Sequence, residues 1–166
     1  MRPRKPVSAR AQALAEARRW IGTPYRHQGS CLGAGCDCLG LLRGIWRTLY
    51  GDEPEAVPPY ERDVVGTPLA GALMQAARRH FCEIDREAAR PGHVLLFAAE
   101  PGGPARHCAV LSQHGRIIHA YWRRSVCETA LTPWWRRRLV GAFAFPDLPA
   151  RPEIDPEEVF AWPSSS

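Results

Sequence analysis

The segment Gly35–Leu42 leads directly into an apolar helical pattern and places a cysteine on the first turn of that helix. Counted from Cys38, apolar residues recur at spacings of 3, 4, 7, 8 and 11, ending at Leu49, which is the periodicity of one helix face. Gly51 follows as a stop signal. The unpaired N–H groups and partial positive charge of a helix N-terminus favour a thiolate, and such settings lower a cysteine pKa from about 8.5 to about 3.5–7.5. The pattern predicts a helix from Cys38 to about Tyr50, with Cys38 as a nucleophile.

Helical patterns come first along the chain and strand patterns follow. Ser8 is expected to cap a first helix whose inner stripe ends at Trp20 and Ile21, and Thr67-Pro68 is expected to start a later helix. Helices followed by strands indicate an α+β fold, with N-terminal helices packed on an antiparallel sheet of about five strands. The strands are predicted at Val94–Ala98, His107–Ser112, Arg116–Tyr121, Val126–Glu128 and Leu139–Phe145.

The charge of the chain is dominated by arginine. There are 21 Arg and one Lys against 17 acidic residues, and the formal net charge is +5. Clusters such as Arg136–Arg138 are expected either to be solvated faces or to attract an anionic polymer, such as a bacterial wall, or an acidic partner protein. Because the arginines are scattered and no nucleic-acid-binding motif is present, a nucleic-acid partner is not expected.

A chain of 166 residues is expected to form a single domain. We expect a disordered basic lead over residues 1–7, the folded domain over residues 8–146, and a Pro-rich acidic tail over residues 147–166. The tail carries an apolar cluster that suggests a docking segment, formed by Val159, Phe160 and Trp162.

Neither a secretory leader nor a membrane-spanning run is visible in the sequence. The chain is therefore expected to be made in the cytoplasm, without membrane insertion, and its six cysteines are expected to remain free thiols. We expect no metal and no cofactor. A zinc site is the competing hypothesis, which the irregular ligand spacing disfavours. Its candidate ligands are Cys31, Cys36, Cys38, His107, Cys108 and Cys127.

A thiolate nucleophile needs an imidazole within hydrogen-bond reach and a third group that orients the imidazole. His107 and His119 lie on adjacent predicted strands joined by a turn around Gly115. A two-residue hairpin would put the two side chains on opposite faces. A three-residue loop over 113–115, with Gly115 left-handed, pairs residue 107 with 121 and puts both histidines on one face. We predict this second register, with His107 as base and His119 as its orienting partner. Two ordinary half-buried histidines are the alternative.

Five short motifs follow one another along the chain. They are Gly22-Thr23-Pro24-Tyr25, Asp37-Cys38-Leu39-Gly40-Leu41, Pro91-Gly92-His93-Val94-Leu95-Leu96-Phe97, His107-Cys108-Ala109-Val110 and Ile118-His119-Ala120. The order and approximate spacing of these motifs, over about residues 8–146, resemble those of the NlpC family of papain-like bacterial cell-wall cysteine peptidases. The resemblance implies a papain-like fold and metal-free cleavage of peptidoglycan stem peptides, typically between D-glutamate and diaminopimelate.

The same resemblance assigns roles to individual residues. Cys38 matches the nucleophile, His107 the base and His119 the orienting residue, while Tyr25 matches a tyrosine whose hydroxyl lies near the thiol. Two positions depart from the family pattern: Leu39 stands where serine is usual, and His93 stands where aspartate is usual.

The compact, arginine-rich chain is most similar to the subgroup of phage cell-wall peptidases, found with tail genes of phages and of phage-like gene transfer agents. This likeness implies tail or baseplate hub proteins as partners, and action at the periplasmic cell wall after carriage on a phage-like particle. One alternative is a tail or baseplate component with vestigial or latent activity. Another is a different thiol-dependent amidase or acyltransferase. Permuted acyltransferase relatives place the histidine before the cysteine, whereas Cys38 precedes His107 here.

Overall fold

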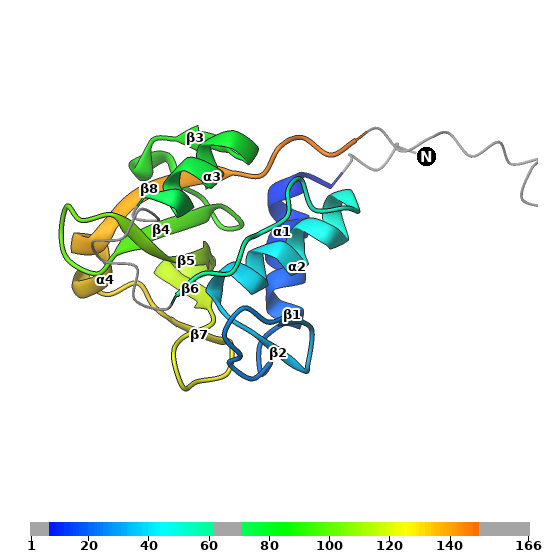
Figure 1. Ribbon diagram of the computed structural model, residues 1–166. Coiled ribbons are helices and arrows are strands. Elements are labelled where there is room, and N and C mark those ends of the chain that lie inside the picture. Colours follow the sequence, from blue (N-terminus) through cyan, green and yellow to red (C-terminus); the bar gives the residue numbers. More distant parts are fainter. Residues whose placement is uncertain (1–6, 62–70, 150–166) are drawn as a thin grey trace, which may run out of the picture.

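The computed structural model describes residues 7–61 and 71–149 (Figure 1). The helices come first along the chain and the strands of the main sheet come later. The helices are α1 Ala9–Arg19, α2 Cys38–Tyr50, α3 Ala72–His80 and α4 Pro133–Arg138. The strands are β1 Ser30–Cys31, β2 Gly35–Cys36, β3 Cys82–Ile84, β4 Val94–Ala98, β5 Ala105–Leu111, β6 Arg116–His119, β7 Cys127–Ala130 and β8 Leu139–Ala144.

The main sheet is antiparallel throughout and has the strand order β3-β8-β4-β5-β6-β7. The predicted α+β class is therefore confirmed. The described sheet has six strands rather than about five, because β3 is a three-residue edge strand too short to show an alternating pattern. β1 and β2 pair separately as a small hairpin within the loop before α2.

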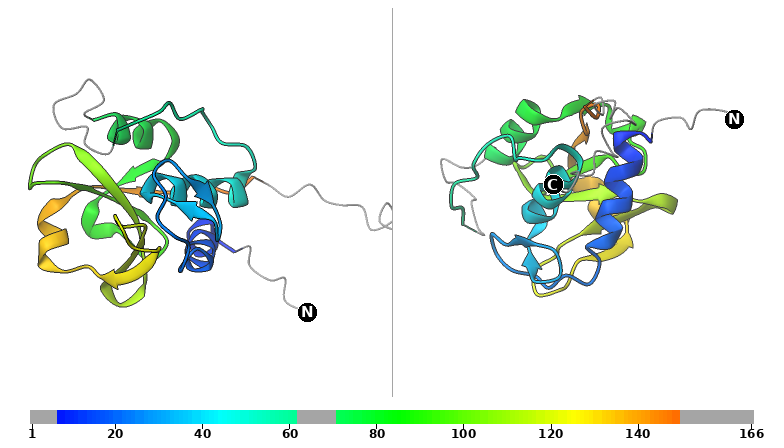
Figure 2. Two further views of the ribbon diagram at one scale, coloured as in Figure 1. Left: turned by 60° about the horizontal axis from the view of Figure 1, so that its bottom comes forward. Right: turned by 90° about the vertical axis from the view of Figure 1, so that its right-hand side faces the viewer.

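The alternation of side chains along the central strands divides the core between the two faces of the sheet. On one face Leu96, Cys108 and Ile118 pack with residues of α1 and α2, two helices that lie side by side in Figures 1 and 2. On the other face Phe97 and Ile117 pack with side chains from the α4 region. The two catalytic candidates on β5 and β6 thus lie in a sheet that is buried on both faces.

The contact between α1 and α2 explains how the nucleophile helix is held. Trp20 is 3% exposed, and its indole N–H donates to Glu16 over 3.1 Å. A Cβ built on Gly44 would lie 2.0 Å from the Trp20 ring, so only glycine allows this approach. The predicted cap is confirmed, since the Ser8 side chain accepts from the backbone N–H of Ala11.

Several predicted element ends were wrong. α1 ends at Arg19, and Ile21, expected on its inner stripe, is 44% exposed. α3 begins at Ala72 after Gly71, which has a left-handed φ of 87°. Its predicted start at Thr67-Pro68 lies outside the described residues. The bounds of the last strands also shift: β5 starts two residues earlier than predicted, β6 and β8 end earlier, and β7 runs from Cys127 to Ala130.

The predicted tail begins inside the described chain. Leu148 packs partly against the core, and the Tyr50 hydroxyl donates to the carbonyl of Pro146 over 2.6 Å. Its apolar cluster at Val159, Phe160 and Trp162 lies outside the described residues, as do residues 1–6 of the predicted lead.

The hairpin between β5 and β6 has the predicted register. Val110 pairs with Ile118 and Leu111 with Ile117. Extended by the same parity, residue 107 faces 121 and residue 109 faces 119. The loop spans residues 113–115, and Gly115 has a φ of 63°. His114 is also left-handed, with a φ of 56°, which the prediction had not assigned. His107 and His119 therefore share one face of the sheet.

Candidate active site

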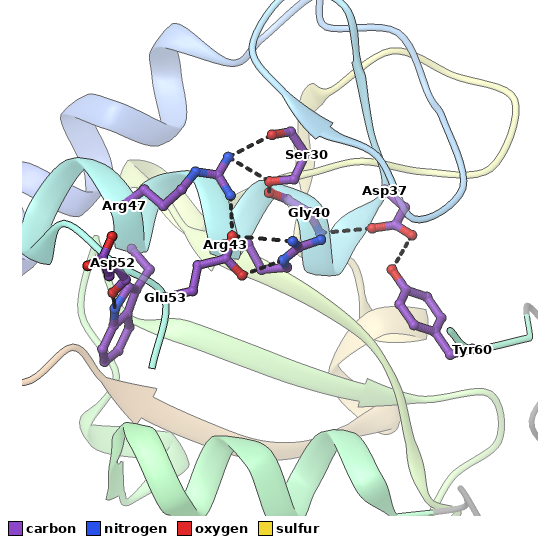
Figure 3. Close-up of polar contacts among 9 residues, drawn as sticks. Ser30, Asp37, Gly40, Arg43, Arg47, Asp52, Glu53 and Tyr60 are labelled. Atoms are coloured by element: carbon purple, nitrogen blue, oxygen red, sulfur yellow. Dashed lines mark hydrogen bonds and ion pairs between the residues drawn. The ribbon is translucent and has the colours of Figure 1, made fainter. Parts of the chain in front are cut away.

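Asp37 fixes the start of α2 (Figure 3). One carboxylate oxygen accepts from the backbone N–H of Gly40 over 2.8 Å, which caps the helix. The other accepts from the backbone N–H of Gln28 over 2.7 Å and from the Tyr60 hydroxyl over 2.5 Å. Asp37 is 3% exposed, so one buried carboxylate ties the loop before α2 and the chain after α2 to the turn that carries Cys38.

Close backbone contact holds the glycine-rich loop against the same turn. A Cβ on Gly40 would lie 1.7 Å from the carbonyl oxygen of Gly29, so the motif glycine two residues after Cys38 is a packing requirement. Further along α2, Arg47 donates to the backbone and hydroxyl oxygens of Ser30 and pairs with Glu53. Burial alone would raise the pKa of Glu53, but hydrogen bonds from Arg43 and Arg47 hold it below its usual value.

Cys38 is half-buried and contacts two consecutive residues of β5. A hydrogen bond from the Cys108 thiol, together with the charge and a hydrogen bond of His107, lowers the pKa of Cys38 well below its ordinary value, against the opposing effect of burial. The same contact and burial raise the pKa of Cys108. Of this thiol pair, Cys38 is therefore the one that ionises more readily.

Cys36 has the opposite environment. It is fully buried, and burial, with the nearby charges of Asp37 and Cys38, raises its pKa to about 12. A thiol in this state is a poor nucleophile. The contrast between two cysteines that are one residue apart favours Cys38 as the reactive one.

A hydrogen-bonded chain runs from His107 into the protein. His107 Nε2 lies 2.9 Å from His119 Nδ1, and His119 Nε2 lies 2.9 Å from the Thr129 hydroxyl. Burial, with the charge of His107, lowers the pKa of His119 to about 3, so His119 is neutral near pH 7. In the proton arrangement that suits a base, His107 Nε2–H donates to His119 Nδ1 and His119 Nε2–H donates to Thr129. His107 Nδ1 then remains for the thiol.

Neutral, buried His119 makes the folding stability depend on pH. Its pKa is about 3 in the folded protein and 6.5 in an unfolded chain, so only the unfolded chain takes up this proton as the pH falls through 6.5. The stability that this residue contributes is fully present above about pH 6.5 and is lost as the pH falls toward 3. The expected loss from this residue at about pH 5 is about 2 kcal/mol.

Urea unfolding at about pH 7 and about pH 5 measures this dependence. His119→Gln, which cannot titrate, should show a smaller loss than wild type by about 2 kcal/mol. His114→Gln, at an exposed turn position, is the matched control. Its free energy of unfolding should fall between the two pH values by as much as that of the wild type. Equal losses for wild type and His119→Gln would refute the neutral, buried state of His119.

A cleft of about 610 Å³ opens over Cys38 and His107. Tyr25 lines it, as do Leu39 and Tyr60, and the Tyr25 ring packs edge-on against Trp122 at 5.6 Å. Cys38, His107, His119 and Tyr25 are thus all at or beside one site. His93, the second departure from the family pattern, lies at the turn before β4, where its Nδ1 accepts from the backbone N–H of Arg90.

Among residues 7–61 and 71–149, no group of three or more His, Cys, Asp or Glu side chains could hold a metal ion. All six cysteines are free thiols. No helix within these residues is both long enough and apolar enough to cross a bilayer.

Sequence reasoning missed three residues of the site. Thr129 lies on β7 diagonal to His119, but the predicted strand stopped at Glu128. Cys108 was quoted within the His107 motif and as a possible metal ligand but was given no role at the thiol, although its place next to His107 could have suggested contact with Cys38. Tyr60 falls in a Pro-rich connection with no periodic signal, and only its hydrogen bond to Asp37 reveals that it forms part of the cleft wall.

A thiol at a helix N-terminus, facing an imidazole on an antiparallel sheet, defines the papain-like class of thiol hydrolase folds. Within this class, the NlpC/P60 family matches residues 22–144, and the chain belongs to that family. The match includes the cysteine, both histidines and the sheet that carries them.

The individual proteins that the chain resembles share about a quarter of its residues or fewer over the matched region. The chain is 23% identical to a gamma-DL-glutamyl hydrolase of Bacillus subtilis (strain 168) over 86% of its own length and 31% of that protein. It is similar to the crystal structure of an NlpC/P60 family protein from Bacillus cereus ATCC 10987, with 26% identity, a TM-score of 0.63, and coverage of 87% of this chain and 42% of that one. The NlpC/p60 domain of the peptidoglycan hydrolase SagA is 26% identical, with a TM-score of 0.55 and coverage of 82% and 98%. The chain therefore spans less than half the length of the first two proteins.

Proposed function

We propose that the protein is a cysteine endopeptidase that hydrolyses peptidoglycan stem peptides. The observation that carries this proposal is the Cys38 thiol at the start of α2, with its pKa lowered by Cys108 and His107, at the base of an open cleft. Peptidoglycan is the expected substrate because the family match and the similarity to the SagA domain both point to cell-wall hydrolysis.

The geometry suggests a reaction in two stages. The Cys38 thiolate attacks the scissile carbonyl carbon, and the resulting oxyanion accepts from the backbone N–H of Cys38 at the helix N-terminus. The His107 imidazolium then gives its proton to the leaving amine, the C–N bond breaks, and a thioester remains on Cys38. Water attacks the thioester, His107 takes one of its protons, and the acid is released with the thiolate restored. His119 and Thr129 hold the His107 ring during both stages.

We propose the bond between D-glutamate and diaminopimelate as the one cleaved. Support comes from the motif resemblance and from the Bacillus subtilis relative, whose name specifies a gamma-glutamyl linkage. Digestion of diaminopimelate-type sacculi by the purified protein, with products read by mass spectrometry, tests the bond. The proposal expects new termini after D-glutamate. Cleavage only at another amide would overturn the bond, and release of no peptide from sacculi or from synthetic stem peptides would overturn the hydrolase.

We further propose that the protein acts at the cell wall as part of a phage-like tail or baseplate. This rests on the sequence resemblance to phage cell-wall peptidases and on the apolar cluster of the tail, residues 147–166. Deletion of residues 150–166 should abolish incorporation into particles while peptidase activity on sacculi persists. Unchanged incorporation would contradict tail docking. A particle-bound protein that never cleaves sacculi would instead be a structural tail component.

A further inference from the structure

The ring of Trp135 on α4 packs directly against both imidazoles of the site. Its centroid lies 5.3 Å from that of His107 with an interplanar angle of 30°, which is a tilted stack. It lies 5.2 Å from His119 at 85°, an edge-on contact. Phe97 packs against the indole from β4 at 4.9 Å. One half-buried side chain therefore covers the histidine pair on the sheet face opposite α1 and α2.

The helix that carries Trp135 is short but firmly attached. Thr132 and Pro133 start it, with Pro133 in the first turn, where its missing N–H costs nothing. Arg138 at its end donates to the backbone carbonyl of Ala99 over 2.9 Å and to that of Trp134 over 3.1 Å. These contacts fasten α4, the helix from which Trp135 reaches the histidines, beside the end of β4.

We propose that Trp135 is a positioning residue that holds the His107 ring and stabilises its protonated form through the face of the indole. The inference rests on the proposed function, in which His107 must be an imidazolium beside the Cys38 thiolate. Hydrogen bonds fix His107 only at its edges: Nε2 is engaged by His119, and the opposite side faces the thiol. A stacked indole restrains rotation out of this plane. A cation within about 6 Å of an indole centroid is also attracted by the ring's negative face.

The charge balance at the site is set by several other titratable groups, which a change at Trp135 leaves in place. His119 and Tyr121 contact the His107 ring edge-on. Phe97 lies tilted to it at 6.2 Å, and the Trp135 indole from α4 is the nearer of the two tilted rings at 5.3 Å. The titratable groups on the thiol side are Cys36, Asp37, Tyr60 and Cys108. Burial, together with the charges of Asp37 and Cys38, raises the pKa values of Cys36 and Tyr60, and contact with Cys38 and burial raise that of Cys108.

The test is the pH dependence of Cys38 alkylation by iodoacetamide in the full chain, followed by peptide mass spectrometry. Trp135→Leu should lower the rate at about pH 6 by about three- to tenfold and move the midpoint of the profile to higher pH, because the imidazolium that stabilises the thiolate loses its stacked ring. Trp135→Phe retains a smaller aromatic face, so it should lower the alkylation rate at about pH 6 by about twofold and shift the midpoint less than Trp135→Leu does.

Trp134→Leu is the matched control, because Trp134 is 44% exposed on the same helix and contacts Trp135 and Arg138 rather than an imidazole. It should leave the profile unchanged. A folded Trp135→Leu variant with the wild-type midpoint, or an equal shift in Trp134→Leu, would overturn the proposal. If Trp135→Leu does not fold, an unchanged midpoint in Trp135→Phe together with an unchanged rate would overturn it. Since alkylation needs no peptidoglycan, a failure to cleave sacculi would refute the proposed substrate without affecting this result.

Discussion

Cys38→Ala should reduce hydrolysis of stem peptides to below about one ten-thousandth of the wild-type rate. The nucleophile and its base act together, so loss of the nucleophile alone removes nearly all of the rate enhancement that they provide. The pKa of this thiol is lowered by Cys108 and His107, and no other cysteine of the described chain shares that combination of contacts. The rate of product formation from a synthetic stem peptide measures the loss. Thermal unfolding should show a small change only, since Cys38 is half-buried at the cleft.

Cys36→Ala and Cys31→Ala are the matched controls for this change. Cys36 is buried with a raised pKa, and Cys31 is exposed on β1. Both variants should retain most of the wild-type turnover once their folded fraction is taken into account. Retained hydrolysis in Cys38→Ala together with its loss in Cys36→Ala would reverse the assignment of the nucleophile.

His107→Gln should lower kcat/KM by about a thousandfold, within the range of about 10²–10⁴ that general acid–base catalysis contributes. Glutamine can still hydrogen-bond to His119, but it cannot carry the proton from the thiol to the leaving amine. Because the charge and hydrogen bond of His107 help to lower the pKa of Cys38, the variant should also move the rise in activity to higher pH. Kinetics across pH on a synthetic stem peptide measure both effects.

His114→Gln provides the comparison for His107→Gln. His114 is exposed in the loop between β5 and β6, on the same hairpin but away from the cleft. Its replacement should leave kcat/KM and the pH profile unchanged. A His107→Gln variant that keeps wild-type activity would show that the imidazole is not the base, even though it lies beside the thiol.

The parts of the fold that could be predicted are those specified by local pattern and parity. The apolar spacing after Cys38 gave the correct bounds of α2, and the length of the loop around Gly115 determined which face His107 and His119 share. In both cases a single periodicity, 3.6 for the helix and 2 for the strands, places the side chains without knowledge of distant contacts.

The parts that could not be predicted depend on contacts between distant segments. α4 is six residues long, too short for a periodic signal, although Thr132-Pro133 repeats the kind of start noted at Thr67-Pro68. Its Trp135 lies against the histidines, and the helix is anchored there by Arg138 to Ala99 and by the packing of Trp135 on Phe97. Ile21 is exposed because α1 ends before the predicted stripe is complete. Such tertiary contacts override local propensity and leave no pattern in the sequence.

The reactive state of Cys38 is most directly measured by competition among the cysteines of the native protein. Limiting iodoacetamide at about pH 6, followed by peptide mass spectrometry, compares half-buried Cys38 with exposed Cys31 and Cys82. A thiolate formed beside His107 predicts that Cys38 is alkylated at least about tenfold faster than either exposed thiol, despite its lower accessibility. Reaction of Cys31 or Cys82 at an equal or greater rate would contradict the assignment of Cys38 as the nucleophile.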